Sequence, residues 1–347
     1  MKDILYFAYP GDLSTRTGGY GYDRRVIAAL RDLGWDLRLV ALGKGFPDPS
    51  EAQLQAAEAL LAEIPDGSLV MIDGLAFGVM DAWAAHNHDR LKIVALVHHP
   101  LALETGVLPE QAEILRERET KALSHTRGIV VTSPATADEL VAHFEVSREA
   151  ISVAIPGCDP ATPARGNGET PLILSIGSLT QRKGHDVLIA ALALLQDIAW
   201  TCRIVGSKAL DPAISAALEA QVDALGLTDR VQLVGEMEDV SAEFARADLF
   251  ALASRYEGYG MVFAEALTHG LPVIACRAGA VPDVVPEAAG LLVPPDDVDK
   301  FGQALRSLLE DPDKRRDMAM AATEAGAQLP SWPDTAGILS RFLETVR

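Results

Sequence analysis

Cysteine is scarce in this sequence of 347 residues, and so are aromatic residues and long apolar runs. The three cysteines, Cys158, Cys202 and Cys276, are scattered and form no Cys-x-x-Cys pair, which excludes a disulfide framework and a structural zinc site. Aromatic residues make up 5% of the chain, and Ala, Leu and Val dominate its apolar content, as in helices packed on parallel sheets. No apolar run reaches about 18 residues, so we expect no membrane-spanning helix and a cytoplasmic protein with reduced thiols.

Positive charge is also in short supply. The chain has 30 Lys and Arg residues against 49 Asp and Glu residues, which gives a formal net charge of −19. Such a surface repels phosphate backbones and anionic lipid headgroups, so we expect no nucleic-acid partner and at most weak membrane association. A small anionic ligand is not excluded, because one local group of amides and Lys or Arg side chains is enough to bind it.

Short β-branched or Leu-rich runs alternate with longer Ala- and Leu-rich stretches along the whole chain. This alternation is typical of βαβ units in a doubly wound parallel sheet, and the length suits two such domains of roughly 150 residues each. We therefore expect an α/β protein with two Rossmann-like domains, whose strand ends meet at a central cleft. The Pro- and Gly-rich segment after Ile155 reads as a linker. The expected domains are residues 1–156 with a final helix 331–347 packing back on them, a linker 157–170, and residues 171–330.

The most informative motif is Glu257-Gly-Tyr-Gly-Met-Val-Phe-Ala-Glu265, which follows an apolar strand and opens a helix. Its glycines let the backbone approach a ligand, and the first amides of the helix are donors that attract an anion. Two carboxylates on either side of a helix N-terminus suit a ligand with hydroxyl groups on both sides of a diphosphate. A helix cap and a solvated Glu are the alternative explanation for each carboxylate taken alone.

This segment resembles the E-x7-E motif of the retaining family-4 glycosyltransferases, which have the two-domain GT-B fold. The resemblance implies that Glu257 faces the hydroxyls of the donor sugar and that Glu265 holds the ribose hydroxyls. It also implies that the amides of Tyr259, Gly260 and Met261 meet the sugar and the phosphates. The activity expected on this basis is the transfer of a hexosyl group from a nucleotide-diphosphate sugar to an unidentified saccharide or other hydroxyl acceptor.

A second motif, Gly-Ser178-Leu-Thr-Gln-Arg182-Lys183-Gly, leaves the first strand of the second domain. A lysine at such a turn can neutralise a leaving diphosphate. The resemblance places Lys183 on the diphosphate, but the family usually has an arginine where this chain has Ser178. We assign Lys183 as catalytic and Ser178 and Arg182 to the donor site, with Arg182 as a candidate replacement for the missing charge.

Weaker matches to the family lie in three loops. The first contains Gly18 and Gly19 and resembles the flexible glycine loop over the donor phosphate, although a plain turn explains it equally well. Gly206 and Met237 follow two later strands, where family members hold the nucleotide base largely through backbone atoms.

A pair of histidines, His98 and His99, ends a buried strand of the first domain. Because side chains alternate along a strand, we expect only one of them to face the site. The resemblance implies that His98 lies near the reaction centre and is catalytic. His99 and Glu104 are weaker candidates for the acceptor site, and a core or capping role is the alternative.

We expect no bound metal and no cofactor besides the donor substrate. The two Asp-x-Asp pairs, which begin at Asp297 and Asp311, stand at helix starts, where carboxylates cap the helix. Two other functions remain open from the sequence: a GT-B-fold sugar-nucleotide epimerase, and a protein that binds a sugar nucleotide without turnover. The missing arginine at Ser178 makes the second one plausible.

Overall fold

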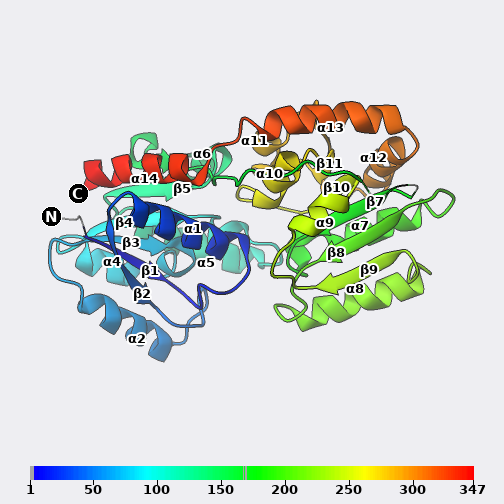
Figure 1. Cartoon of the computed structure of the whole chain (residues 1–347). Coiled ribbons are helices and arrows are strands. Elements are labelled where there is room, and N and C mark those ends of the chain that lie inside the picture. Colours follow the sequence, from blue (N-terminus) through cyan, green and yellow to red (C-terminus); the bar gives the residue numbers. More distant parts are fainter. Residues whose placement is uncertain (1–3, 167, 169) are drawn as a thin grey trace. The chain divides into compact units, whose positions relative to one another are not determined.

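The computed structural model describes residues 4–166, 168 and 170–347, and the chain divides into two compact units. Unit 1 extends to Gly157 and includes the segment Pro330–Arg347, and unit 2 is Cys158–Leu329. Each unit is an α/β domain built on one six-stranded parallel sheet, and its elements are labelled in Figure 1. This architecture confirms the expected fold class of two Rossmann-like domains.

The sheet of unit 1 has the strand order β2-β1-β3-β4-β5-β6. Its central strands form because they are continuous apolar runs, and every residue of β3 and β5 is buried. The strands are β1 (Ile4–Tyr9), β2 (Asp36–Ala41), β3 (Leu69–Asp73), β4 (Lys92–Val97), β5 (Gly128–Val131) and β6 (Ile151–Val153).

The helices of unit 1 connect these strands and include the last helix of the chain. They are α1 (Gly18–Asp32), α2 (Glu51–Ala62), α3 (Gly74–Phe77), α4 (Asp81–Asn87), α5 (Pro109–Leu123), α6 (Pro134–His143) and α14 (Trp332–Val346), with two 3-10 turns, η1 (Leu101–Leu103) and η2 (Arg148–Ala150). Helix α14, red in Figure 1, belongs to unit 1, and hydrogen bonds tie it to other elements of that unit. The Trp35 indole donates to Ser340, and the Thr335 hydroxyl donates to the carbonyl of Ile155.

The sheet of unit 2 has the strand order β12-β11-β10-β7-β8-β9. The strands are β7 (Leu172–Ile176), β8 (Thr201–Val205), β9 (Val231–Gly235), β10 (Leu249–Leu252), β11 (Val273–Cys276) and β12 (Gly290–Val293). The helices are α7 (His185–Ala193), α8 (Pro212–Ala224), α9 (Ser241–Arg246), α10 (Met261–Thr268), α11 (Val281–Val284), α12 (Val298–Leu309) and α13 (Pro312–Gly326), with the 3-10 turn η3 (Gln181–Lys183).

The described part of the expected linker is held by unit 2. The amide of Ala164 donates to the carbonyl of His269, and the amide of Arg165 donates to that of Ala245. The ring of His269 also contacts the carbonyl of Thr162 at 2.9 Å. The described part of this Pro-rich segment forms no helix or strand, as its composition indicated. Its backbone is nevertheless hydrogen-bonded to other parts of unit 2. Residues 167 and 169 of the expected linker lie outside the described residues.

Candidate functional site

Two turns of unit 2, η3 and the turn after β10, are fixed to one another. Gly184 ends η3 in the left-handed conformation, with φ of 64°, and a Cβ there would come within 1.9 Å of the carbonyl oxygen of Ala253. Only glycine permits this approach. The amide of Arg255 donates to the carbonyl of Arg182 at 2.8 Å, and the Arg182 guanidinium donates to the carbonyl of Tyr256 at 3.0 Å. The fold therefore brings both sequence motifs of unit 2 to one place.

Lys183 and Glu257 form a buried ion pair where these turns meet. The Lys183 ammonium donates to Oε1 of Glu257 at 2.6 Å, and the side chains are 13% and 6% exposed. Ser254 donates to the same oxygen at 2.6 Å, and Arg182 lies 3.4 Å from Oε2. Burial alone would raise the pKa of Glu257, but Lys183, Arg182 and Ser254 outweigh it and hold that pKa below its usual range. The site thus contains two cations on one ionised carboxylate.

Helix α10 begins directly beside this cluster. Its N-cap, Gly260, is left-handed with φ of 93° and supplies no side-chain cap to the first amides, starting at Met261. Tyr259 is buried, and Glu265 lies one turn inside the helix, half-buried. Burial, Glu265 and Asp159 raise the pKa of the Cys158 thiol to about 12, so Cys158 lies within electrostatic reach of Glu265. A helix start without a side-chain cap beside two cations is suited to an anion.

The turn after β7 is packed against the turn after β8. A Cβ on Gly206 would come within 1.9 Å of the carbonyl oxygen of Gly177, so glycine is required there for close packing. The ring of His185 contacts the same carbonyl at 3.2 Å, and burial lowers the pKa of His185 to about 4, which makes it a neutral hydrogen-bond donor. Ser178 follows Gly177 directly and is half-buried, and Met237 is half-buried in the loop after β9.

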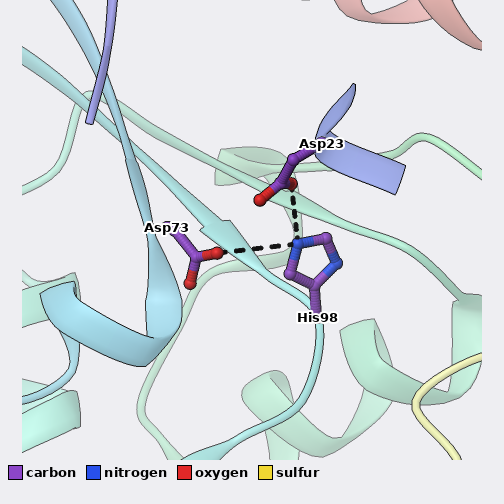
Figure 2. A group of neighbouring side chains, drawn as sticks. All are labelled: Asp23, Asp73 and His98. Atoms are coloured by element: carbon purple, nitrogen blue, oxygen red, sulfur yellow. Dashed lines mark hydrogen bonds and ion pairs between the residues drawn. The ribbon is translucent and has the colours of Figure 1, made fainter. Parts of the chain in front are cut away.

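The second cluster is in unit 1 and contains His98, which follows β4. Figure 2 shows two carboxylates directed at one nitrogen of its ring, Asp23 from α1 and Asp73 from the end of β3. Nε2 of His98 lies 3.0 Å from Oδ1 of Asp23 and 4.0 Å from Oδ2 of Asp73. Asp23 is completely buried and Asp73 nearly so. The edge of the Tyr22 ring also packs on the imidazole, with 5.2 Å between the ring centroids.

The electrostatics of this cluster follow from burial and from the two like charges. Burial and the nearby Asp23 raise the pKa of Asp73 to about 7. Burial disfavours the charged form of His98, but Asp23 and Asp73 outweigh it and raise the pKa of His98 above its usual value. Near neutral pH the cluster therefore retains protons that isolated side chains would release.

The glycines of the first loop are placed differently from what the sequence suggested. Gly18 and Gly19 form the first turn of α1 and do not lie in a flexible loop, because the side chain of Thr17 caps the helix by accepting from the amide of Tyr20. A Cβ on Gly19 would stand 3.5 Å from the His98 ring, so this turn packs on the imidazole. Thr17 is the N-cap signal that the sequence interpretation overlooked.

The two weaker candidates of unit 1 face each other. Nε2 of His99 lies 3.7 Å from Oε2 of Glu104, so His98 and His99 contact different carboxylates, as expected for neighbouring residues at a strand end. The same loop is held by Glu119 of α5, which accepts from the amide of Leu101 at 2.9 Å. Burial raises the pKa of Glu119 to about 8.

Within the described residues, one group of side chains has metal-ligand spacing. It consists of Asp23, Asp73 and His98, whose ligand atoms lie within 4.8 Å of one another. Nε2 of His98, the ring nitrogen nearest both carboxylates, is hydrogen-bonded to Asp23. The group therefore fits a hydrogen-bonded ion pair better than a metal site. Asp297 and Asp311 each cap a helix, through the amides of Lys300 and Lys314.

The sequence interpretation missed Asp23 and Asp73, although both carried a signal. Asp73 is a carboxylate that ends a fully buried strand. Asp23 shares a helical face with Val26, Ile27 and Leu30, where a charged residue is unexpected. Ser254 and His185 were also missed, because their roles depend on contacts between separate turns.

The topology of two parallel six-stranded sheets, each with its own flanking helices, defines the GT-B class of fold. Residues 163–325, most of unit 2, match the family described as Glycosyl transferases group 1, so unit 2 belongs to that family. The expected relationship to glycosyltransferases is confirmed. In the part of the chain that is described, no helix has the length and apolar character needed to cross a membrane.

Several named proteins are similar in sequence over most of the chain. A D-inositol 3-phosphate glycosyltransferase of Corynebacterium kroppenstedtii is 29% identical over 76% of this chain and 63% of its own length. One of Arthrobacter is 32% identical over 72% of this chain and 65% of its own length. The chain thus spans slightly less than two thirds of these two relatives.

Solved structures share the fold over the whole chain. Sucrose-phosphate synthase from Thermosynechococcus elongatus superposes with a TM-score of 0.83, 24% identity and full coverage of both chains. Anabaena HepE in complex with UDP and glucose superposes with a TM-score of 0.79, 18% identity and coverage of 98% and 99%.

Proposed function

We propose that the protein is a retaining, metal-independent glycosyltransferase that moves a hexosyl group from a nucleoside-diphosphate sugar to a small hydroxyl acceptor. The observation that carries the proposal is the cluster of Lys183, Arg182 and Glu257 beside the start of α10. Its cations and amides can bind a diphosphate, and its carboxylate can bind sugar hydroxyls.

The chemistry follows from where charge develops. As the bond between sugar and phosphate breaks, negative charge grows on the leaving diphosphate, and preorganised donors stabilise that charge in the transition state. Lys183 and Arg182 supply such donors without a metal. Without a donor, Lys183 and Arg182 are paired with Glu257. When the donor binds, its diphosphate takes the place of Glu257 as the anionic partner of these cations. Glu265 on α10 is assigned to the ribose, and Tyr259, Gly260 and Met261 to the sugar and phosphates.

The position usually occupied by arginine holds Ser178, and the structure supports Arg182 as its replacement. Arg182 lies 3.4 Å from the same carboxylate that Lys183 contacts, so both cations are directed to one place. In unit 1, His98 is assigned to the reaction centre, because it is a half-buried imidazole whose charged form two carboxylates favour. The acceptor attacks from the face that the phosphate leaves, and the leaving phosphate takes the acceptor's proton.

The names of the relatives guide the choice of substrates. One solved neighbour was crystallised with UDP and glucose, and another is named for sucrose phosphate. A sequence relative is named for D-inositol 3-phosphate. We therefore propose a small phosphorylated polyol or sugar as the acceptor class, with UDP-sugars as the first donors to test.

The test is a thermal-shift screen of UDP, GDP and ADP and their hexoses, followed by turnover assays with each donor that binds. A ligand at 100 times its dissociation constant stabilises the folded protein by about 2.7 kcal/mol, which such a screen detects. Binding together with acceptor-dependent release of nucleoside diphosphate supports the proposal. Epimerised sugar nucleotide without any acceptor indicates an epimerase instead, and binding without turnover indicates a sensor or carrier.

A further inference from the structure

The function proposed above gives Asp23 and Asp73 no separate roles, yet both are buried acidic groups beside His98. They come from α1 and from the end of β3 and converge on one ring nitrogen (Figure 2). Burying an ionised carboxylate is costly unless it is paired, so two of them around one imidazole need an explanation.

His98 is held by the cluster in a defined orientation. Its Nε2 is bonded to Asp23 at 3.0 Å, the Tyr22 ring packs on it edge-on, and the first turn of α1 covers it at Gly19. In Figure 2 the other ring nitrogen, Nδ1, points away from both carboxylates. The ring is thus fixed on one side, and its second nitrogen is left to contact a ligand.

The charges of the cluster also have to balance. Oδ2 of Asp23 is buried and has no hydrogen-bond partner among the described residues. Asp73 caps α3 through Oδ1, which accepts from the amide of Leu75 at 2.7 Å, and its Oδ2 faces the ring. The phenols of Tyr20 and Tyr22 lie within electrostatic reach of these carboxylates, and burial together with the carboxylates raises the pKa of both phenols. A proton on Asp73 that is directed to Asp23 would leave one negative charge, which the imidazolium neutralises.

We propose that Asp23 is a positioning residue: it holds His98 as an imidazolium whose Nδ1–H is presented to the substrate. Asp73 is the protonated acid of the pair, so the two carboxyl groups together carry one negative charge. The proposal rests on the function proposed above only in naming the ligand, an oxygen of the sugar or of the leaving diphosphate. A charged donor makes a hydrogen bond roughly twice as strong as a neutral one. Nothing is transferred in this step, because the proton stays on His98.

The direct test is the titration of His98 followed by NMR of protein labelled at histidine, with its signal assigned by its loss in His98→Gln. Asp23→Asn keeps the shape and removes the charge, and we expect it to lower the pKa of His98 by about 1–3 units, the usual effect of a neighbouring opposite charge. Asp73→Asn, which still caps α3, is the matched control and should shift it less, because Asp73 lies 4.0 Å away. An unchanged His98 titration in Asp23→Asn, or a larger shift in Asp73→Asn, overturns the proposal.

Kinetics separate positioning from a structural role. If the protein transfers sugar, Asp23→Asn should lower kcat at neutral pH about 10-fold or more with a smaller change in KM. It should also move the alkaline side of the pH profile to lower pH, because the imidazolium of His98 then loses its proton at a lower pH. Asp23→Glu should restore part of the rate. An unchanged pH profile contradicts the proposal even if transfer is observed. Because the titration needs no turnover, failure of the proposed function leaves the NMR result interpretable.

A bound cation is the competing explanation of the cluster. Addition of Zn²⁺ or Mn²⁺ to the chelator-treated protein, followed by NMR of the labelled histidines, distinguishes a cation site from the proposed ion pair. The proposal expects the His98 signals to keep their shifts near neutral pH, and a stoichiometric change in those signals overturns it.

Discussion

Replacement of Lys183 by Ala is the perturbation with the largest expected effect, because it changes both stability and chemistry. Lys183 and Glu257 are joined at 2.6 Å with little solvent access, so removing the ammonium leaves a carboxylate in a buried place. Breaking a buried pair in this way costs about 3–5 kcal/mol in proteins. Ser254 and Arg182 still contact Glu257, so we expect about 3 kcal/mol for unit 2, at the lower end.

The assay is native-state amide hydrogen exchange of β7 and β10, whose slowest amides report the free energy of unfolding of unit 2. Lys208→Ala is the matched control, because its ammonium lies at a similar distance, 2.7 Å, from Glu219 but on the surface. It should cost no more than about 1 kcal/mol. The double variant Lys183→Ala with Glu257→Gln should lose clearly less than the sum of the two single variants. Additive losses would refute the reasoning that the pair is energetically linked.

Three further outcomes are expected. Glu265→Ala should weaken binding of free nucleoside diphosphate, measured by calorimetry, whereas Glu257→Ala should mainly impair sugar recognition; equal losses of nucleotide affinity would contradict these assignments. Turnover should survive EDTA, and activity that is lost in chelator and restored by Mg²⁺ or Mn²⁺ would show a metal requirement. Burial raises the pKa of Glu119 to about 8, so between about pH 5 and 8 Glu119 is protonated in the folded protein and ionised in the unfolded chain. As the pH rises through this range, the free energy of unfolding therefore falls by up to about 1.4 kcal/mol per pH unit. Glu119→Gln should therefore flatten the pH dependence of the Tm of unit 1, and an unchanged slope would show that Glu119 is ionised in the folded state.

The sequence predicted the fold well, because apolar strands and capped helices are local patterns. Eleven short apolar runs of the sequence coincide with strands of the two sheets, and their ends differ from those of the strands by at most two residues. The runs are 4–9, 37–42, 68–73, 92–98, 128–133, 171–177, 201–206, 230–235, 249–254, 272–277 and 290–295. The sequence interpretation missed β6, whose three residues are only half-buried and too few to show a period. It also placed Gly18 and Gly19 in a loop, because two glycines outweighed the cap at Thr17.

The site was only partly predictable. The motifs of unit 2 identified Lys183 and Glu257, but no spacing in the sequence says that two turns 74 residues apart join these side chains directly. The pairing of His98 with Asp23 could not be predicted for the same reason, since the two residues are 75 positions apart. An acid on the apolar face of a helix marked Asp23 as unusual but did not name its partner. Contacts between loops depend on the topology of the sheet, which local patterns do not contain.

Acceptor-dependent release of nucleoside diphosphate tests the central claim most directly. The protein is incubated with each nucleoside-diphosphate hexose that it binds and with a panel of phosphorylated polyols and sugars, and the nucleoside diphosphate is quantified for wild type, Lys183→Ala and Lys208→Ala. We expect release that depends on the acceptor in wild type, a kcat reduced by about 10²–10³ in Lys183→Ala, the range for losing one preorganised donor, and an unchanged rate in Lys208→Ala. A Lys183→Ala protein with near-normal kcat, or the absence of release with any donor that binds, would contradict the account.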